Sequence, residues 1–184
     1  MKVTVFKNFS EPSENLPLLS ILEQIRDGSF RDEVESLRTL IKNEQKKEYS
    51  QQKKKLPAFT PSGIFDGGRK LEFLKSYSGI IVLDIDKVDS VDLPSLKSIA
   101  SEILCTYACF ISPSNCGLKI LVRVDSRQAY HKQAFEQVKE YYEALLKLSV
   151  DRTGKDITRL CFFSFDETIY INTYSEIFKT KIAM

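Results

Sequence analysis

The sequence predicts an α+β fold in which helices cover one face of an antiparallel or mixed sheet. From residue 79 onward, the patterns of apolar residues are typical of strand, helix, strand, strand, helix, strand and strand, in that order. The run 79–86 is apolar up to residue 83, as expected for a central buried strand. The link at 113–116 is too short for a crossover, so its flanking strands form an antiparallel hairpin.

Each element follows from hydrophobic periodicity and from residues that break helices. Helices are expected where apolar residues recur three and four apart, at 17–26, 32–54, 93–104 and 126–148. Strands are expected at 1–6, 57–65, 79–86, 107–112, 117–124, 159–165 and 168–172. The second helix is very polar beyond Asn43, so this part is expected to project from the core or to fray, and Pro57 ends it. Asp92 is a candidate cap, and the last two strands pair around a turn at Asp166 and Glu167.

The composition is that of one folded domain. Hydrophobic residues make up 42% and charged residues 28% of the 184 residues. We expect a single domain over 1–184, with an N-terminal strand and helices at 1–55 and a core at 56–184 that carries the site. No apolar run approaches the roughly 18 residues of a membrane span, and the start lacks an apolar signal core. We therefore expect a cytoplasmic chain without a membrane partner.

The four cysteines and the one histidine offer little for zinc chemistry. The cysteines lack Cys-x-x-Cys spacing and lie in or beside apolar runs, so buried reduced thiols are expected in preference to a zinc site or disulfides. His131 lies near the start of a polar helix without a partner nearby in sequence. It is expected to be a surface side chain.

Asp84 and Asp86 end the buried strand at 79–86. Residues two apart on a strand point to the same face, with α-carbons roughly 6 to 7 Å apart. Two carboxylates that close repel each other unless a cation neutralises them, and an all-oxygen set suits Mg²⁺ or Mn²⁺. Alternatively, Asp84 caps the strand and Asp86 starts a turn toward Lys87.

A third carboxylate would complete a two-metal site of the kind used for in-line displacement at phosphorus. Asp151 follows an apolar helix and is the first candidate, and Asp156 is the competing one. The alternative for Asp151 is a loop aspartate that caps the next turn.

The hairpin at 112–119 carries groups that suit a phosphate. The hydroxyls of Ser112 and Ser114 can donate hydrogen bonds, Gly117 permits close approach of the backbone, and Lys119 adds a compact positive charge. Taken alone, the segment is equally a turn with a surface lysine.

Two further sets of cations are candidates for phosphate contacts. Arg159 enters an apolar strand and needs an anion, which is either Asp151 or Asp156 in a structural salt bridge, or a triphosphate. The net charge is only +2, but lysines crowd into 46–55. That run is either a solvated helix face or a contact to a nucleic-acid backbone.

In this order, the motifs resemble the three signatures of archaeo-eukaryotic primases and primase-polymerases. Asp84 and Asp86 match the first, an acidic pair that closes an apolar strand. The second is a serine-bearing hairpin that ends in Gly-x-His, and 114–119 stands in its place. The third is an aspartate followed by an arginine that enters a strand, as in Asp151 and Arg159.

More closely, the chain resembles the VirE N-terminal or BT4734-like domain of bacterial mobile elements. The similarity lies in the string 56–65, the hairpin 112–114 and the tail 159–172. It implies a primase-like core with an RRM-like sheet and a metal-dependent nucleotidyltransferase of a mobile-element or phage-type replication protein. The implied ligands are Mg²⁺ or Mn²⁺, nucleoside triphosphates and a single-stranded or primed DNA template. A helicase-type ATPase often follows this domain and is the further partner implied.

The resemblance assigns the candidate residues to three groups. The catalytic metal ligands are Asp84, Asp86 and Asp151. The nucleotide-binding residues are Ser112, Ser114, Lys119 and Arg159. The nucleic-acid contacts are Lys53, Lys54, Lys55 and Arg69.

Two alternatives to an active polymerase remain. Lys119 stands where primases have the hairpin histidine, and a lysine cannot share a proton near neutral pH as imidazole does. The chain could therefore be a weak or inactive module that binds nucleotide or nucleic acid for a partner helicase. A phosphohydrolase of the haloacid dehalogenase type matches 83–88 superficially. It is disfavoured because its loop has a glycine where Lys87 stands and its lysine begins a helix.

Overall fold

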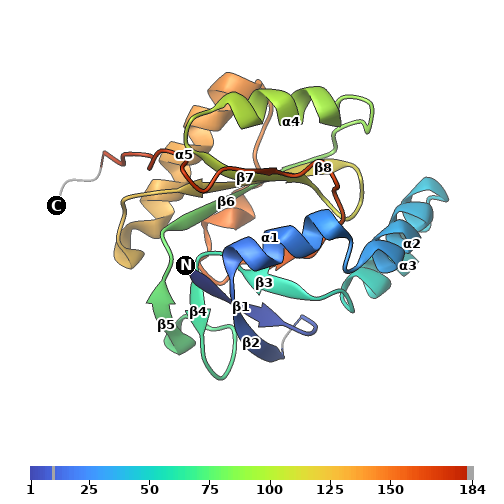
Figure 1. The fold of residues 1–184 in the computed structure, drawn as a ribbon, viewed down its shortest axis with the longest axis horizontal. Helices are drawn as coiled ribbons and strands as arrows, with labels where there is room; N and C mark the ends of the chain where they lie inside the picture. Colours follow the sequence, from blue (N-terminus) through green and yellow to red (C-terminus); the bar gives the residue numbers. More distant parts are fainter. Residues whose placement is uncertain (10, 182–184) are drawn as a thin grey trace.

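The computed structural model describes residues 1–9 and 11–181, which form a mixed α+β fold (Figure 1). Its helices are α1 (Leu18–Asp27), α2 (Arg31–Lys42), α3 (Lys46–Lys53), α4 (Leu93–Glu102) and α5 (His131–Leu146). Three short 3₁₀ turns are η1 (Leu71–Phe73), η2 (Gln128–Tyr130) and η3 (Arg152–Lys155). The strands are β1 (Lys2–Phe6), β2 (Pro12–Pro17), β3 (Ala58–Thr60), β4 (Gly63–Phe65), β5 (Leu74–Tyr77), β6 (Ile80–Asp86), β7 (Thr106–Ile111), β8 (Gly117–Arg123), β9 (Cys161–Phe162) and β10 (Tyr170–Ile171).

The central sheet has the strand order β10-β7-β8-β6, and its strand pairings are antiparallel. Alternate residues of β6 face opposite sides. Leu83 and Ile85 belong to a core cluster with residues of α4 and α5, whereas Ile80 and Val82 belong to a second cluster with residues of α1. Figure 1 shows α4 and α5 on one side of this sheet and α1 on the other. The α+β class and the buried strand are confirmed, but helices cover both faces and not one.

A second sheet contains the N-terminal strands in the order β2-β1-β3-β9, also antiparallel. The hairpin of β4 and β5 is tied to it, because the Phe65 N–H donates to Thr4 Oγ1 at 2.8 Å. Val3 and Phe59 of this sheet share the second core cluster with α1 and the central sheet. Within the described ranges, every helix is too short or too polar to reach across a bilayer.

The single helix predicted at 32–54 is wrong, because a turn at 43–45 divides it into α2 and α3. Glu44 has φ 58° and the Gln45 N–H donates to the Leu40 carbonyl, which closes the end of α2. The polar sequence beyond Ile41 provides no apolar stripe to keep the helix straight. In the second half, none of the residues of α3 is buried, although Tyr49 packs beside the second core cluster.

The strand pair predicted around Asp166 is also wrong. β9 pairs with β3 and β10 pairs with β7, so the two strands belong to different sheets. Asp166 is buried, and its carboxylate accepts from Lys97 Nζ at 2.8 Å, the Ile111 N–H at 2.9 Å and the Thr168 N–H at 3.0 Å. These bonds hold the turn against α4 and β7, so the strands on either side diverge.

The start of α5 differs from the prediction in two respects. The helix begins at His131 and not at 126, with η2 before it. His131 is only 1% exposed, which corrects its predicted surface position. Its Nδ1 lies 3.0 Å from the hydroxyl oxygen of Tyr77, which links α5 to β5. Burial lowers the pKa of His131 to about 4, so the ring is neutral in the folded chain at neutral pH.

Acidification should destabilise the chain through His131. The unfolded imidazole has a pKa of about 6.5, so between pH 6.5 and 4 the unfolded chain takes up a proton that the folded chain does not. The free energy of unfolding therefore decreases as the pH is lowered through this window, at about 1.4 kcal/mol per pH unit and by about 3 kcal/mol in all. In urea titrations we expect His131→Gln to show a flatter pH dependence than the wild type. Equal slopes would contradict a neutral buried ring.

Candidate functional site

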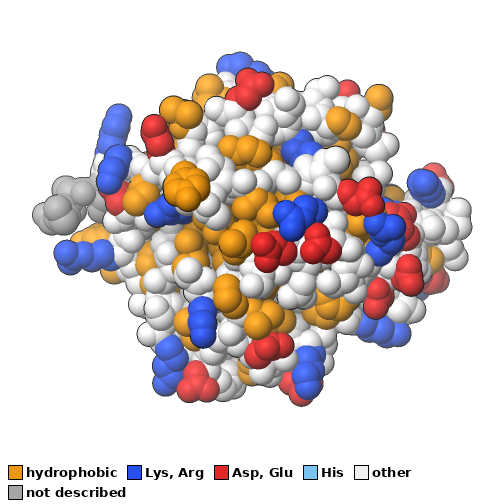
Figure 2. Space-filling view, viewed as in Figure 1, with side chains coloured by type: hydrophobic (Ala, Val, Ile, Leu, Met, Phe, Trp, Pro, Cys, Tyr) orange, Lys and Arg blue, Asp and Glu red, His pale blue; other side chains and the backbone are white. Residues whose placement is uncertain are grey.

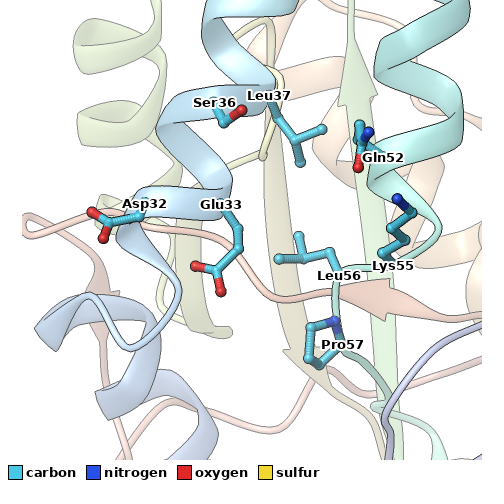
Figure 3. A pocket seen from close by; sticks show the side chains of 8 residues that line it. All are labelled: Asp32, Glu33, Ser36, Leu37, Gln52, Lys55, Leu56 and Pro57. Atoms are coloured by element: carbon cyan, nitrogen blue, oxygen red, sulfur yellow. The ribbon is translucent and has the colours of Figure 1, made fainter.

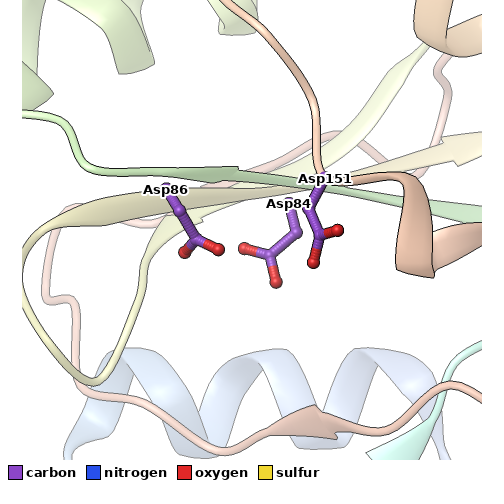
Figure 4. A group of neighbouring side chains, drawn as sticks. All are labelled: Asp84, Asp86 and Asp151. Atoms are coloured by element: carbon purple, nitrogen blue, oxygen red, sulfur yellow. The ribbon is translucent and has the colours of Figure 1, made fainter.

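Three carboxylates meet at the end of β6. Asp84 and Asp86 project from the same face of this strand, and Asp151 comes from the segment after α5. The Asp151 N–H donates to the Asp84 carbonyl oxygen at 2.8 Å, which attaches that segment to β6. One carboxylate oxygen of each residue lies within 4.8 Å of the other two. Figure 4 shows the three side chains directed to the same side of the sheet, so the predicted trio is brought together.

Two cations neutralise Asp84. Lys119 stands directly opposite it in the register of β6 and β8, and Lys119 Nζ forms an ion pair with Asp84 Oδ2. A guanidinium nitrogen of Arg159 lies 3.5 Å from the same oxygen and 3.4 Å from Asp151 Oδ2. Asp84 and Lys119 are 4% and 9% exposed, so water screens this pair little. Of the anions considered for Arg159, Asp151 is a partner and Asp156 forms no ion pair with it among the described residues.

Asp84 is not fully satisfied by these partners. Its other oxygen, Oδ1, is buried and has no hydrogen-bond partner among the described residues. A buried carboxylate oxygen without a partner is costly, and such groups are uncommon in folded proteins. The all-oxygen donor set and the unpartnered oxygen together suit a small divalent cation.

The pKa values of the other two carboxylates, Asp86 and Asp151, shift in opposite directions. Burial raises the pKa of Asp86, and the negative charge of Asp84 raises it further. Burial also opposes the charge on Asp151, but hydrogen bonds from Thr153 and the positive charge of Arg159 outweigh it and lower the pKa. Asp151 is therefore the more firmly ionised of the two.

Gly154 allows the segment that carries Asp151 to lie against β6. A Cβ at this position would come 2.6 Å from the Val82 carbonyl oxygen and 2.8 Å from the Phe135 ring. The side chain of Asp151 caps η3 by accepting from the Thr153 N–H at 3.0 Å. The capping role considered for Asp151 is thus real, and the residue also belongs to the acidic cluster.

The hairpin of β7 and β8 reaches the same edge of the sheet. Gly117 stands opposite Asp86, and a Cβ there would come 2.4 Å from a β6 carbonyl oxygen, so only glycine fits. The hydroxyl oxygens of Ser112 and Ser114 lie 3.0 Å apart, and the Ser114 hydroxyl partly offsets the effect of burial on the pKa of Tyr49. Hydroxyl groups and closely packed backbone therefore flank the acidic cluster.

A hollow of about 370 Å³ opens beside the cluster, with Asp84 and Asp86 in its lining. Cations from four parts of the chain line it too, namely Lys53, Lys54, Arg69, Lys119 and Arg159. Burial lowers the pKa of Lys53, and the positive charge of Lys119 lowers it further. The hollow thus combines acidic and basic groups at close range.

Aromatic rings complete the lining, and sequence reasoning missed all of them. Lys53 Nζ lies 5.5 Å and 5.2 Å from the ring centroids of Tyr49 and Phe162. The guanidinium carbon of Arg69 lies 4.6 Å from the centroid of the Phe9 ring. Burial raises the pKa of Tyr49 to about 12, so its hydroxyl stays protonated. An aromatic ring in the otherwise polar run 42–55 was the one available hint, since such a ring needs an apolar contact.

Lys55 and Asp156 do not line the hollow beside the acidic cluster. Lys55 lines a different hollow of about 490 Å³ between α2 and α3 (Figure 3), so it lies apart from Lys53 and Lys54. Asp156 lines a third hollow with His131, and its carboxylate accepts from the Thr158 N–H. The hollow at Lys55 is larger than the one at the acidic cluster, so size alone does not identify the site.

The face that carries α1 shows no segregation of charge. In Figure 2, acidic and basic side chains alternate over this face with hydrophobic ones between them. The mixture agrees with the net charge of +2. A nucleic-acid contact therefore has no support from the charge pattern of this face.

The fold is an α+β domain, and its site is a carboxylate trio at the end of a central strand, flanked by a serine-bearing hairpin and by lysine and arginine side chains. The family model of the BT4734-like N-terminal domain matches residues 51–171, well over half of the 184 residues. The chain belongs to this family. The matched segment includes all three carboxylates. Searches of curated proteins and of solved structures found no match.

Substitution of Gly154 should loosen the attachment of Asp151 to β6. Because a Cβ would overlap the Val82 carbonyl oxygen, we expect Gly154→Ala to lower the free energy of unfolding by about 1–3 kcal/mol. The Asp151 amide should also exchange its hydrogen faster. Lys155→Ala, at an exposed neighbour, is the control and should change stability by less than about 0.5 kcal/mol. Urea unfolding and NMR hydrogen exchange measure both, and a wild-type exchange rate in Gly154→Ala would contradict the role of close packing.

Proposed function

We propose that this chain is a primase-polymerase-like nucleotidyltransferase domain that transfers nucleotides onto a template-bound strand. The observation that supports it best is the meeting of Asp84, Asp86 and Asp151 within 4.8 Å, beside a hollow that is lined by Asp84, Asp86 and several cations. Carboxylates that gather a divalent ion beside cations that attract phosphates are the minimum set for phosphoryl transfer. The family membership is compatible with it, as is the serine-bearing hairpin.

Asp84, Asp86 and Asp151 would hold the Mg²⁺ or Mn²⁺. When bound, the ions supply Lewis-acid activation of a hydroxyl and neutralise charge on the triphosphate. The carboxylates are suited to this because Asp151 is ionised and Asp84 has a free oxygen. In the proposed reaction, a 3′-hydroxyl would give its proton to water and its oxygen would bond to the α-phosphorus, while the bond from that phosphorus to the bridging oxygen of the leaving diphosphate would break and release diphosphate.

The cations would bind the negative charge of the triphosphate. Lys119 and Arg159 already face the carboxylates, and Lys53 extends the positive region toward Tyr49 and Phe162. Ser112 and Ser114 can donate to phosphate oxygens, as hydroxyls at a close-packed turn commonly do. Fixed charges in a partly dehydrated hollow stabilise developing charge more strongly than mobile ones in water.

Lys54 and Arg69 are the proposed contacts to the template strand. Both line the same hollow, and Arg69 is held by a hydrogen bond of 3.1 Å to the Thr158 carbonyl oxygen. The rings of Phe9 and Tyr49 nearby can stack on bases without sequence preference. Lys55 is not part of this proposal, since it faces another hollow.

A second candidate is a catalytically weak module that binds nucleotide or nucleic acid for a helicase-type ATPase. The observation that favours it is the pairing of Lys119 with Asp84, because this lysine cannot shuttle a proton as a histidine would. The same ligands would then bind without turnover. Binding of a labelled nucleotide together with absent incorporation would separate this candidate from the enzyme.

Primer extension with Mg²⁺ and Mn²⁺ in parallel tests the enzyme. We expect Asp86→Asn and Asp151→Asn to lower the yield of extended product by roughly 100-fold or more, because each loses a charge that positions the ions. Asp156→Asn is the matched control, since this exposed aspartate lies a few residues beyond Asp151 and outside the trio. It should extend primers like the wild type. Undiminished yield in both site variants would remove the catalytic assignment.

A further inference from the structure

Two buried lysine–aspartate pairs in this chain differ in how completely the carboxylate is satisfied. Asp166 binds Lys97 through both oxygens, and backbone and side-chain donors complete its bonds. Asp84 meets Lys119 and Arg159 through one oxygen only, and its other oxygen is buried without a partner among the described residues. The first pair is saturated and structural. The second leaves a ligand position open.

We propose that Lys119 acts as an internal counter-ion that makes binding of the divalent ion and binding of the triphosphate depend on each other. This inference rests on the proposed function, because it concerns the same site. Without nucleotide, Lys119 pairs with Asp84 and opposes the entry of a divalent cation. With a triphosphate in the hollow, Lys119 turns from Asp84 to the phosphates and leaves the carboxylate free for the ion.

The position of Lys119 allows its side chain to contact either Asp84 or a bound triphosphate. It stands opposite Asp84 in a regular part of the β6–β8 ladder, so its backbone is fixed and only its side chain needs to move. It also lines the hollow next to Lys53 and Arg159, where a triphosphate would concentrate negative charge. A flexible four-carbon side chain that ends in a compact charge can reach either anion.

The electrostatics explain why the two ligands would arrive together. A divalent ion brought to Asp84 while Lys119 remains places like charges in a buried site, which is unfavourable where water screens little. A triphosphate brought without the ion meets three carboxylates, which repel it. Each ligand removes the obstacle to the other, and linkage requires the two effects to be equal in size.

Metal binding at constant pH tests the proposal without relying on turnover. Free Mn²⁺ is measured by electron paramagnetic resonance, with and without a nucleoside triphosphate analogue that cannot be hydrolysed. For the wild type we expect Mn²⁺ to bind at least tenfold more tightly when the analogue is present. Lys119→Gln keeps a hydrogen-bond donor but no charge, and should bind Mn²⁺ alone at least tenfold more tightly than the wild type and show little further gain with the analogue.

Lys97→Gln is the matched control, because it removes an equally buried lysine from the saturated pair at Asp166. It should lower stability but leave Mn²⁺ binding and its dependence on the analogue unchanged. Should Lys119→Gln fail to fold, Arg159→Gln removes the other cation from Asp84. This variant is expected to bind Mn²⁺ more tightly than the wild type in the absence of the analogue, by a smaller factor than Lys119→Gln.

The failure of this inference looks different from the failure of the proposed function. If the wild type binds Mn²⁺ equally well with and without the analogue, or if Lys119→Gln binds it no more tightly, the counter-ion role is overturned while the metal and nucleotide site stands. If neither protein binds Mn²⁺ even with the analogue, both proposals fall. If binding is coupled as described but no primer is extended, the inference holds and the non-catalytic module is favoured.

Discussion

The pairing of Asp84 with Lys119 across β6 and β8 is the constraint on which the site depends. Two carboxylates two residues apart at the end of a buried strand would repel each other and destabilise it, so a cation has to stand within reach. The antiparallel register supplies one on the neighbouring strand, at the position directly opposite. A shift of one residue would turn Lys119 to the face occupied by α4 and α5, which is apolar. Register and charge balance therefore support each other.

Segments far apart in sequence are held beside Asp84 and Lys119 by hydrogen bonds, close packing and strand pairing. The segment with Asp151 is attached to β6 by a backbone hydrogen bond and by close packing at Gly154. β9 carries Phe162 and pairs with β3, which brings the N-terminal sheet over the hollow. The turn between α2 and α3 returns Tyr49 and Lys53 to the same place. The site thus lies where the two sheets and α3 converge.

The sequence predicted what depends on neighbours along the chain and missed what depends on distant ones. The central strand, the β7–β8 hairpin and the acidic pair could be found because alternation and turn length are local properties. The separation of β9 and β10 into different sheets could not, because it follows from the burial of Asp166 against Lys97, a contact across 69 positions. His131 was misplaced for the same reason, since Tyr77 covers it from another element. Composition does not reveal which rings will line a hollow.

The backbone on either side of the acidic cluster adopts left-handed conformations that are uncommon for residues other than glycine. Lys87 follows Asp86 directly and has φ 61°, and Asn115 at the hairpin tip has φ 55°, although neither is glycine. The Val88 N–H donates to the Cys116 carbonyl oxygen at 3.0 Å, so these two strained turns hold each other in place beside the carboxylates. Strain of about 1–3 kcal/mol per residue persists only where surrounding structure enforces it. Together with the unpartnered oxygen of Asp84, it marks the end of β6 as a place where the fold gives up stability to keep charged groups available.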